Sequence, residues 1–196
     1  MSDDLFALLP GATPLTPEEQ EGLIPSWIAT REDLNAAEEA NIEEAIIWMS
    51  RRRSPSILTE AFARQLHAKM FGEVWRWAGD YRTTGKNIGV DPAQVSMRLR
   101  GLFDDVAYWI KEVVYSPEEI AVRLHHQLVF IHPFANGNGR HARLMADILI
   151  QLNGGRLLTW GQVSLVTKSE TRDAYITALK CADTHDIGPL MAFATS

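Results

Sequence analysis

Helix-start signals recur along the whole chain and constrain its fold more than any other feature of the sequence. A capping residue is followed directly by proline at Thr16–Pro17, Asp91–Pro92 and Ser116–Pro117, and this pair is typical of the first turn of an α-helix. Thr30 begins a further start, with Asp33 three residues later in the pattern of a capping box. These signals predict a mainly helical fold.

Apolar residues at helical spacing set the expected helix lengths. The spacing predicts a helix from Thr30 through Trp48, then helices at about 57–71, 92–106, 117–131, 138–152 and 169–182, and a short one after Gly188–Pro189. Residues 75–90 lack this period, and Gly85 and Gly89 bracket Lys86–Ile88, which predicts a short hairpin or lid. We therefore expect an all-α protein with one irregular lid in its middle.

Composition excludes several classes of protein. The 19 basic side chains against 25 acidic ones give a formal net charge of −6, which disfavours direct nucleic-acid binding. One cysteine, Cys181, excludes a disulfide framework and a cysteine-built zinc site. No apolar run approaches the roughly 18 residues of a membrane span, and the acidic N-terminus lacks a signal-peptide pattern. The composition predicts a cytoplasmic protein that does not enter a membrane.

The stretch from His132 to Arg143 contains the candidate catalytic and anion-binding residues. One helix should end at His132–Pro133, because proline disfavours helix in the residue before it. A loop with Gly137 and Gly139 then leads directly into an apolar helix, so that backbone N–H groups and the positive end of the helix dipole form an anion site. Arg140 and Arg143 lie on one face of the first turn, where arginine opposes the dipole and therefore indicates a bound anion.

His132 precedes this anion site by a few residues and is a candidate general base beside a phosphate. Asn136 and Asn138 add short polar contacts to the same loop. By themselves these residues indicate phosphoryl or nucleotidyl transfer. The alternative is an ordinary Gly-Asn-Gly turn next to a histidine that only caps a helix.

The same stretch resembles the signature of the Fic family, His-Pro-Phe-x-(Asp/Glu)-Gly-Asn-Gly-Arg-x-x-Arg. The matching positions are His132, Pro133, Phe134, Gly137, Asn138, Gly139, Arg140 and Arg143. Further similarity lies in Glu38–Asn41 (the first core helix), in Gly79–Arg82 with the lid at 85–89 (the flap), and in Ser169–Tyr175 (the segment after the motif). The resemblance covers about residues 16–195, and the branch it suggests is the Fic-type group called mobile mystery protein B.

The resemblance implies an all-α Fic fold, a helical bundle with a short β-hairpin flap over the active site. It places the Fic domain at residues 30–196, after an N-terminal segment at 1–29 that carries an inhibitory helix. There Glu21, followed by Gly22, would clamp Arg143 in the resting state, although the match to the family's inhibitory motif is imperfect. An ordinary solvated glutamate at a helix end is the alternative for Glu21.

The activity that the resemblance implies is that of a protein adenylyltransferase. Such an enzyme transfers AMP from ATP to a Ser, Thr or Tyr hydroxyl of a target protein and releases pyrophosphate. His132 would act as the base, Asn138 would hold the α-phosphate, and Arg140 would neutralise the departing phosphates together with Arg143. Gly137, Asn138, Gly139, Arg140 and Arg143 would bind the nucleotide, and Thr84, Gly85, Lys86, Asn87, Ile88 and Gly89 would bind the target segment as an added strand.

Asn136 departs from the family pattern, because it stands at the position of the acid that helps to hold Mg²⁺. An amide oxygen is a weaker ligand than a carboxylate for this cation. Three outcomes are open: Mg²⁺ held mainly through ATP and water, a different donor or metal, or a poorly active enzyme. Gly139 stands where a kinase branch of the family carries lysine, which favours nucleotidyl transfer.

Two further classes of function stay open at this stage. The chain could be a nucleotide-binding regulatory module with little turnover, or a Fic-like transferase that uses another nucleotide donor. The mobile-element resemblance also suggests a toxin–antitoxin pair with a partner antitoxin, and a homodimer is a further expectation.

Overall fold

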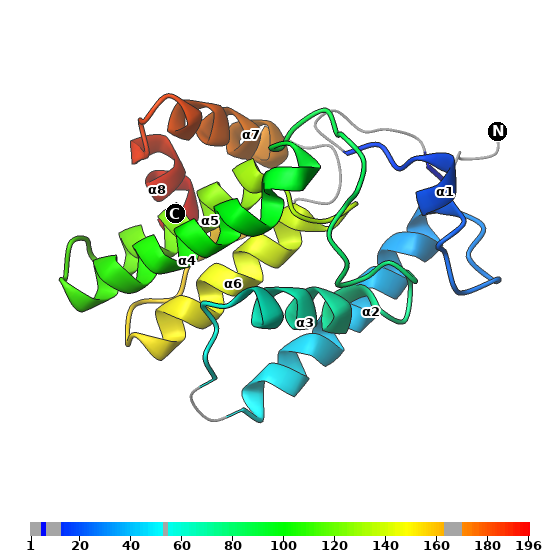
Figure 1. Ribbon diagram of the computed structural model, residues 1–196, viewed down its shortest axis with the longest axis horizontal. Helices are drawn as coiled ribbons and strands as arrows, with labels where there is room; N and C mark the ends of the chain where they lie inside the picture. Colours follow the sequence, from blue (N-terminus) through cyan, green and yellow to red (C-terminus); the bar gives the residue numbers. More distant parts are fainter. Residues whose placement is uncertain (1–4, 7–12, 53–54, 163–169) are drawn as a thin grey trace.

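The computed structural model describes residues 5–6, 13–52, 55–162 and 170–196. In these ranges the chain folds into helices joined by loops (Figure 1). The bounds are α1 Pro17–Gln20, α2 Arg31–Ser50, α3 Glu60–Phe71, α4 Val95–Lys111, α5 Pro117–Ile131, α6 Asn138–Leu152, α7 Glu170–Asp183 and α8 Gly188–Thr195, with 3₁₀ turns η1 Pro92–Gln94 and η2 Trp160–Gln162. The predicted all-α fold is confirmed. Ser169, the expected first residue of α7, lies outside the described residues.

The predicted capping residues begin the helices. Thr16 and Thr30 each form a full capping box, in which the hydroxyl accepts from the backbone N–H three residues later and the acidic side chain there returns the bond. Ser116 accepts from Glu119 N–H at 3.2 Å. Asp91 caps the 3₁₀ turn η1, so α4 begins three residues later than the Asp91–Pro92 pair suggests.

Helices α5 and α6 lie side by side at the centre of the molecule (Figure 1). Helix α4 packs on α5, α3 packs on α6, and α2 packs on α3. The large apolar cluster between them includes Leu66, Leu99, Leu124 and Met145. A second cluster joins α7 and α8 to the central pair. The two central helices are therefore fixed on several sides, and the loop between them is held at both ends.

The lid does not form the predicted β-hairpin. Residues 83–90, called the flap below, contain no strand, and one isolated bridge joins Tyr81 to Phe134 just before them. The physical reason is Arg82, whose buried side chain takes up flap carbonyls that a hairpin would pair with its own backbone. The flap is thus an irregular loop fastened to the core.

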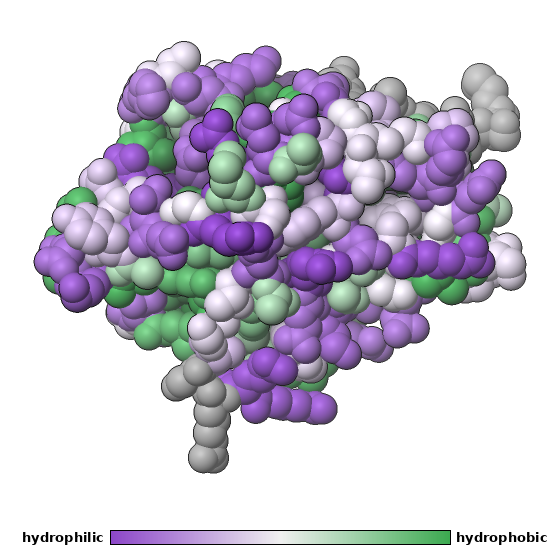
Figure 2. All heavy atoms as spheres, viewed as in Figure 1, coloured by the Kyte–Doolittle hydropathy of each residue, from purple (hydrophilic) through white to green (hydrophobic). Residues whose placement is uncertain are grey.

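Most of the molecular face in Figure 2 is polar, with smaller apolar areas between the helices. Of the helices in the described ranges, none combines the length and apolarity that a bilayer span requires.

Candidate functional site

A cavity of about 870 Å³ brings together most of the residues that the sequence singled out. Its wall contains His132, Asn136, Gly137, Asn138, Gly139, Arg140, Arg143 and the flap residues Asn87, Ile88 and Gly89. The cations Arg31, Arg140, Arg143, Arg172 and Lys180 line it, against the carboxylates Glu38, Asp173 and Asp183. This excess of positive charge favours an anionic ligand, and the volume suits a small organic molecule.

The loop between α5 and α6 delivers backbone N–H groups to this cavity. Gly137 is the N-cap of α6 and has a left-handed backbone with φ of 75°. A Cβ atom at Gly137 would lie 2.6 Å from the Phe71 ring, so both the conformation and the close approach require glycine. Asn138 fixes the same turn: its Oδ1 accepts from Phe134 N–H at 2.9 Å and its Nδ2 donates to Phe134 O at 2.8 Å. The Asn138 side chain therefore shapes the loop, a positioning role that differs from the predicted hold on the α-phosphate.

His67 supports this loop from below. Its Nδ1 accepts from Gly79 N–H at 3.0 Å, so its Nε2 carries the proton and donates to Asn136 O, also at 3.0 Å. The ring is fully buried and stacks on Phe134 with 3.8 Å between the ring centres. Burial lowers the pKa of His67 well below its usual value. A neutral imidazole thus fixes the backbone on which the cavity floor is built.

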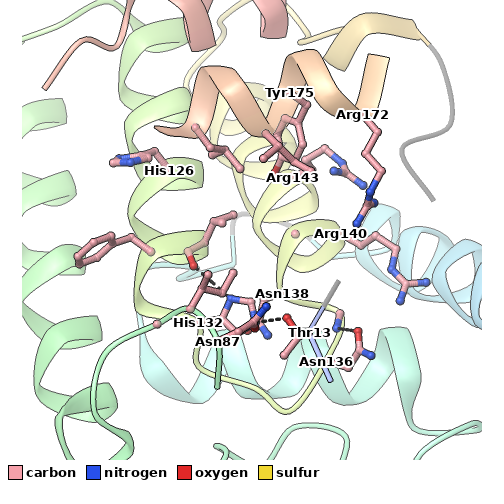
Figure 3. A pocket seen from close by; sticks show the side chains of 18 of the residues that line it. Thr13, Asn87, His126, His132, Asn136, Asn138, Arg140, Arg143, Arg172 and Tyr175 are labelled. Atoms are coloured by element: carbon pink, nitrogen blue, oxygen red, sulfur yellow. Dashed lines mark hydrogen bonds between the residues drawn. The ribbon is translucent and has the colours of Figure 1, made fainter. Parts of the chain in front are cut away.

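Arg140 lies on the first turn of α6, as predicted, whereas Arg143 lies at the start of the second turn, and the two have different partners. Figure 3 shows them with Arg172 on one side of the cavity, while His132 and Thr13 lie on the other. The Arg140 Nη1 lies 2.7 Å from Glu38 Oε2. Glu38 is 4 % exposed. An ion pair with so little water around it both orients Arg140 and offsets part of its charge.

Arg143 lies deeper than Arg140, and burial lowers the pKa of its guanidinium, which still stays charged. It approaches the ring of Tyr175, with 5.7 Å from Cζ to the ring centre. The Tyr175 hydroxyl in turn lies 2.9 Å from His125 Nε2. Residues of α5, α6 and α7 therefore position this second arginine together.

His132 is the left-handed C-cap of α5, with φ of 55°. Its Nδ1 lies 3.3 Å from Val129 O, which is an acceptor only, so Nδ1 carries the proton and Nε2 has a free lone pair. That Nε2 lies 2.9 Å from Thr13 Oγ1 (Figure 3). Burial is the main cause that lowers the pKa of His132 to about 4, with Arg82 and Lys86 adding to it. The imidazole is therefore a neutral base in contact with a hydroxyl.

Arg82 joins the flap to the His132 backbone. Its Nε donates to His132 O at 2.6 Å, its Nη1 to Thr84 O at 2.9 Å, and its Nη2 to Val90 O. Of the predicted flap residues, 87–89 line the cavity, while Thr84 and Lys86 contact Glu19 of the N-terminal segment. The flap therefore lies beside the predicted base.

Glu21 lies outside this site. Its side chain is exposed at the end of α1, and its backbone carbonyl accepts from Arg76 at 3.3 Å. Helix α1 is so short that Glu19, two residues earlier, is the residue that turns toward the flap. The predicted Glu21–Arg143 clamp is contradicted by this geometry; the carboxylate that meets a motif arginine is Glu38.

The site fits phosphates better than a metal. Asn136, the predicted metal ligand, uses its Oδ1 to accept from Gly137 N–H at 2.6 Å. Among the described residues, no group of three His, Cys, Asp or Glu side chains could hold a metal ion. The arginines and the N-terminus of α6 suit the phosphates of ATP, whereas the described side chains do not form a protein-ligated Mg²⁺ site.

From the sequence, no role at the site was assigned to four side chains that contact it, although two of them, Glu38 and Arg82, lie in segments that resemble the family. Glu38 falls on the buried stripe of α2 at positions 34, 38, 41 and 45, where a carboxylate needs a partner. Thr13, His67 and Arg82 meet the site through contacts 50 or more residues distant in sequence. No local pattern marks such residues.

Comparison with known proteins agrees with this geometry. The sequence model of the Fic/DOC family matches residues 57–150. Protein adenylyltransferase fic-1 of Caenorhabditis elegans is 30% identical over 123 residues, which are 59% of this chain and 22% of that protein. Protein adenylyltransferase Fic of Nematostella vectensis is 29% identical over 133 residues, 66% of this chain and 30% of that protein. The chain thus spans less than a third of these curated relatives.

Solved structures show the same fold. A fragment of Fic-1 from C. elegans superposes with a TM-score of 0.65 at 25% identity, covering 89% of this chain and 51% of that one. The BepC protein of Bartonella tribocorum, with bound AMPPNP, gives a TM-score of 0.68 at 20% identity, covering 91% of this chain and 96% of that one.

Proposed function

Since the chain belongs to the Fic/DOC family through residues 57–150, we propose that it is a protein adenylyltransferase. It would transfer AMP from ATP to a Ser, Thr or Tyr hydroxyl of a target protein. The observation that carries the proposal is the neutral His132, whose Nε2 faces a hydroxyl at 2.9 Å beside an arginine-lined anion cavity. The second support is the similarity to curated relatives that are named protein adenylyltransferases.

In the transfer, the target hydroxyl gives its proton to His132 Nε2 as its oxygen attacks the α-phosphorus. A bond forms between that oxygen and the α-phosphorus, and the bond from the α-phosphorus to the bridging oxygen of the β-phosphate breaks. Pyrophosphate leaves with the electron pair. A positioned base typically contributes about 10²–10⁴-fold, and the Val129 carbonyl holds His132 in the tautomer that this role needs.

The N-terminus of α6 stabilises the negative charge of the phosphates. Backbone N–H groups of residues 138–140 aim at the α-phosphate, and Arg140 and Arg143 neutralise the leaving group. Arg140 can turn from Glu38 toward phosphate, since a triphosphate as a whole carries more negative charge than the single carboxylate that it would replace. We assign adenylyl transfer to a domain at residues 30–196. We assign a regulatory role to the N-terminal segment at residues 1–29.

The flap holds the target. Residues 84–89 lack paired strands, so their backbone groups can bind an extended segment of a target protein by backbone hydrogen bonds. Because Arg82 fixes both ends of the flap, a segment bound there lies next to His132. Backbone recognition of this kind leaves target choice to shape and to the few flanking side chains.

Asn136 supports a second candidate, a nucleotide-holding module with slow turnover. The Asn136 side chain completes the loop through Gly137 N–H, and an aspartate oxygen could make the same bond while its second oxygen supplies charge for a cation brought by the nucleotide. Asn136→Asp should therefore keep the loop and raise turnover if the natural site is weakened. Equal turnover in the wild type and in Asn136→Asp would favour an enzyme that needs no carboxylate at position 136.

The test is transfer of label to protein from ATP labelled on the α-phosphate, with Mg²⁺, in a host-cell lysate. His132→Asn is the inactive variant, because asparagine tolerates positive φ and lacks the basic imidazole. His185→Asn is the matched control, since His185 also has positive φ, at 71°, but is exposed and away from the cavity. Label that persists in His185→Asn and disappears in His132→Asn supports the proposal; equal label in both variants refutes it. Label that arises only from γ-labelled ATP would indicate a kinase instead.

The finer expectations stay predictions. These are the mobile mystery protein B branch, the toxin–antitoxin pair with its antitoxin partner, a homodimer and a cytoplasmic location. Copurification of a neighbouring gene product with this chain would test the antitoxin, and light scattering of the purified chain would test the dimer.

A further inference from the structure

We propose that Thr13 is an acceptor of AMP within its own chain, so that the protein modifies itself at this hydroxyl. The inference rests on the proposed adenylyl transfer and adds a specific acceptor to it. It starts from the position of Thr13, a residue 119 positions before His132 in the sequence yet in direct contact with it.

The contact has the geometry of a base and its substrate. Thr13 Oγ1 and His132 Nε2 are 2.9 Å apart, within the range for a proton transfer through one hydrogen bond. Because His132 Nδ1 carries its proton toward Val129 O, the hydroxyl is the donor and Nε2 the acceptor. The low pKa of His132, about 4, keeps this lone pair unprotonated at neutral pH. Thr13 thus occupies the place at which an acceptor hydroxyl must stand.

The neighbouring residues hold Thr13 there. Lys86 donates from Nζ to Pro14 O at 2.9 Å and forms an ion pair with Glu19. The Lys86 side chain is 1% exposed, so this pair is nearly withdrawn from water. Thr84 donates its hydroxyl hydrogen bond to Glu19 Oε1 at 3.0 Å. The flap therefore fastens the residues on the C-terminal side of Thr13, and the hydroxyl is held at the base without diffusion of a second molecule.

Thr13 also shares the anion cavity. Thr13 and Leu15 line the same cavity as Arg140 and Arg143. An acceptor, a base and cations for the phosphates thus lie in one enclosure. Holding reactants in such an arrangement replaces a bimolecular step by an intramolecular one, which lowers the entropic part of the barrier.

The transfer of AMP to Thr13 needs no reactant other than ATP. The Thr13 Oγ–H proton passes to His132 Nε2, Oγ forms a bond with the α-phosphorus of ATP, and the bond from that phosphorus to the β-phosphate oxygen breaks. The products are Thr13 esterified with AMP, pyrophosphate and a protonated imidazole, which then releases its proton to water.

The test uses the purified full chain, ATP labelled on the α-phosphate and Mg²⁺, followed by peptide mapping by mass spectrometry. Label on the peptide that contains Thr13, with the mass of one AMP group, is the expected result. Thr13→Ala should lower self-labelling to the level of His132→Asn, and Thr13→Ser should restore it. Thr195→Ala is the matched control, because Thr195 is an exposed threonine at the end of α8 that does not line the cavity, and it should leave self-labelling unchanged.

Two comparisons make the result decisive. In a mixture of the wild-type chain with a tagged His132→Asn chain, the tagged chain should stay unlabelled, and the rate per chain should not depend on protein concentration. Label on the tagged chain, or on a residue other than Thr13, would overturn the inference. Transfer to lysate proteins without label on Thr13 would overturn it and leave the proposed function standing, whereas no transfer to any protein would refute both.

Discussion

Acidification should destabilise this protein steeply through its buried histidines. His132 and His141 are 5% and 1% exposed, and burial lowers the pKa of each to about 4 from a usual value of 6.5. In the unfolded chain each ring binds a proton as the pH falls through 6.5. In the folded chain each ring stays neutral until the pH falls to about 4. The contribution of these two neutral rings to the free energy of unfolding is therefore complete above pH 6.5. It is lost as the pH falls from about 6.5 to about 4.

The magnitude follows from linkage. Each pKa unit corresponds to about 1.4 kcal/mol, so a ring that titrates at 4 when folded and at 6.5 when unfolded removes about 2 kcal/mol between pH 7 and pH 5. His132 and His141 together remove about 4 kcal/mol. This is a large fraction of the 5–15 kcal/mol by which a typical domain is stable.

The assay is urea unfolding at pH 7 and at pH 5, followed by circular dichroism. Carboxylates also titrate in this range, so the decisive quantity is a difference between variants. His132→Asn should lose about 2 kcal/mol less than the wild type between the two pH values. His185→Asn replaces an exposed histidine and is the control for the loss of an imidazole elsewhere in the chain. Equal losses in all three proteins would show that His132 is not held neutral by burial.

The remaining predictions concern the loop, its arginine and the flap. Gly137→Ala should cost on the order of 2 kcal/mol and abolish nucleotide binding, since alanine must adopt positive φ and meet the Phe71 ring; calorimetry of unfolding and of ATP binding measures both. Glu38→Gln should tighten ATP binding by about 1 kcal/mol, roughly fivefold, because it removes the charge that competes with phosphate for Arg140, and a higher Kd would contradict this. Arg82→Met should destabilise the fold by about 3 kcal/mol in urea unfolding, because the carbonyls of His132, Thr84 and Val90 lose a charged donor. Unchanged stability would show that these hydrogen bonds make no net contribution to the free energy of unfolding.

Local signals predicted the helices well and the long-range contacts poorly. Capping residues such as Thr30 and Ser116 act on N–H groups within their own first turn, so their effect can be read from a few neighbouring positions. The place of Arg140 on the first turn of α6 was predicted for the same reason, because it follows from the glycine loop before it, and Arg143 comes one turn later. What failed was the hairpin, where glycine spacing indicated a turn but Arg82 took up the backbone groups that a second strand would need.

The regulatory prediction failed for a related reason. Glu21 was chosen by its place in a short motif, whereas the position of a carboxylate relative to a distant arginine depends on how α1 and α2 pack. That packing brings Glu38 to Arg140 and leaves Glu21 in solvent. The contact between Thr13 and His132 is also a long-range contact, since it joins residues that are 119 positions apart in the sequence.

Under the proposed function, the Arg82 side chain has a consequence for how targets would be discriminated. It binds both ends of the flap and the backbone carbonyl of His132, so the proposed docking surface and the proposed base are joined through one side chain. Any strain that a poorly matched target puts on the flap is passed to the base. Selectivity among targets should therefore appear in kcat as much as in KM, and a protein that docks badly would be a slow substrate even at saturating concentration.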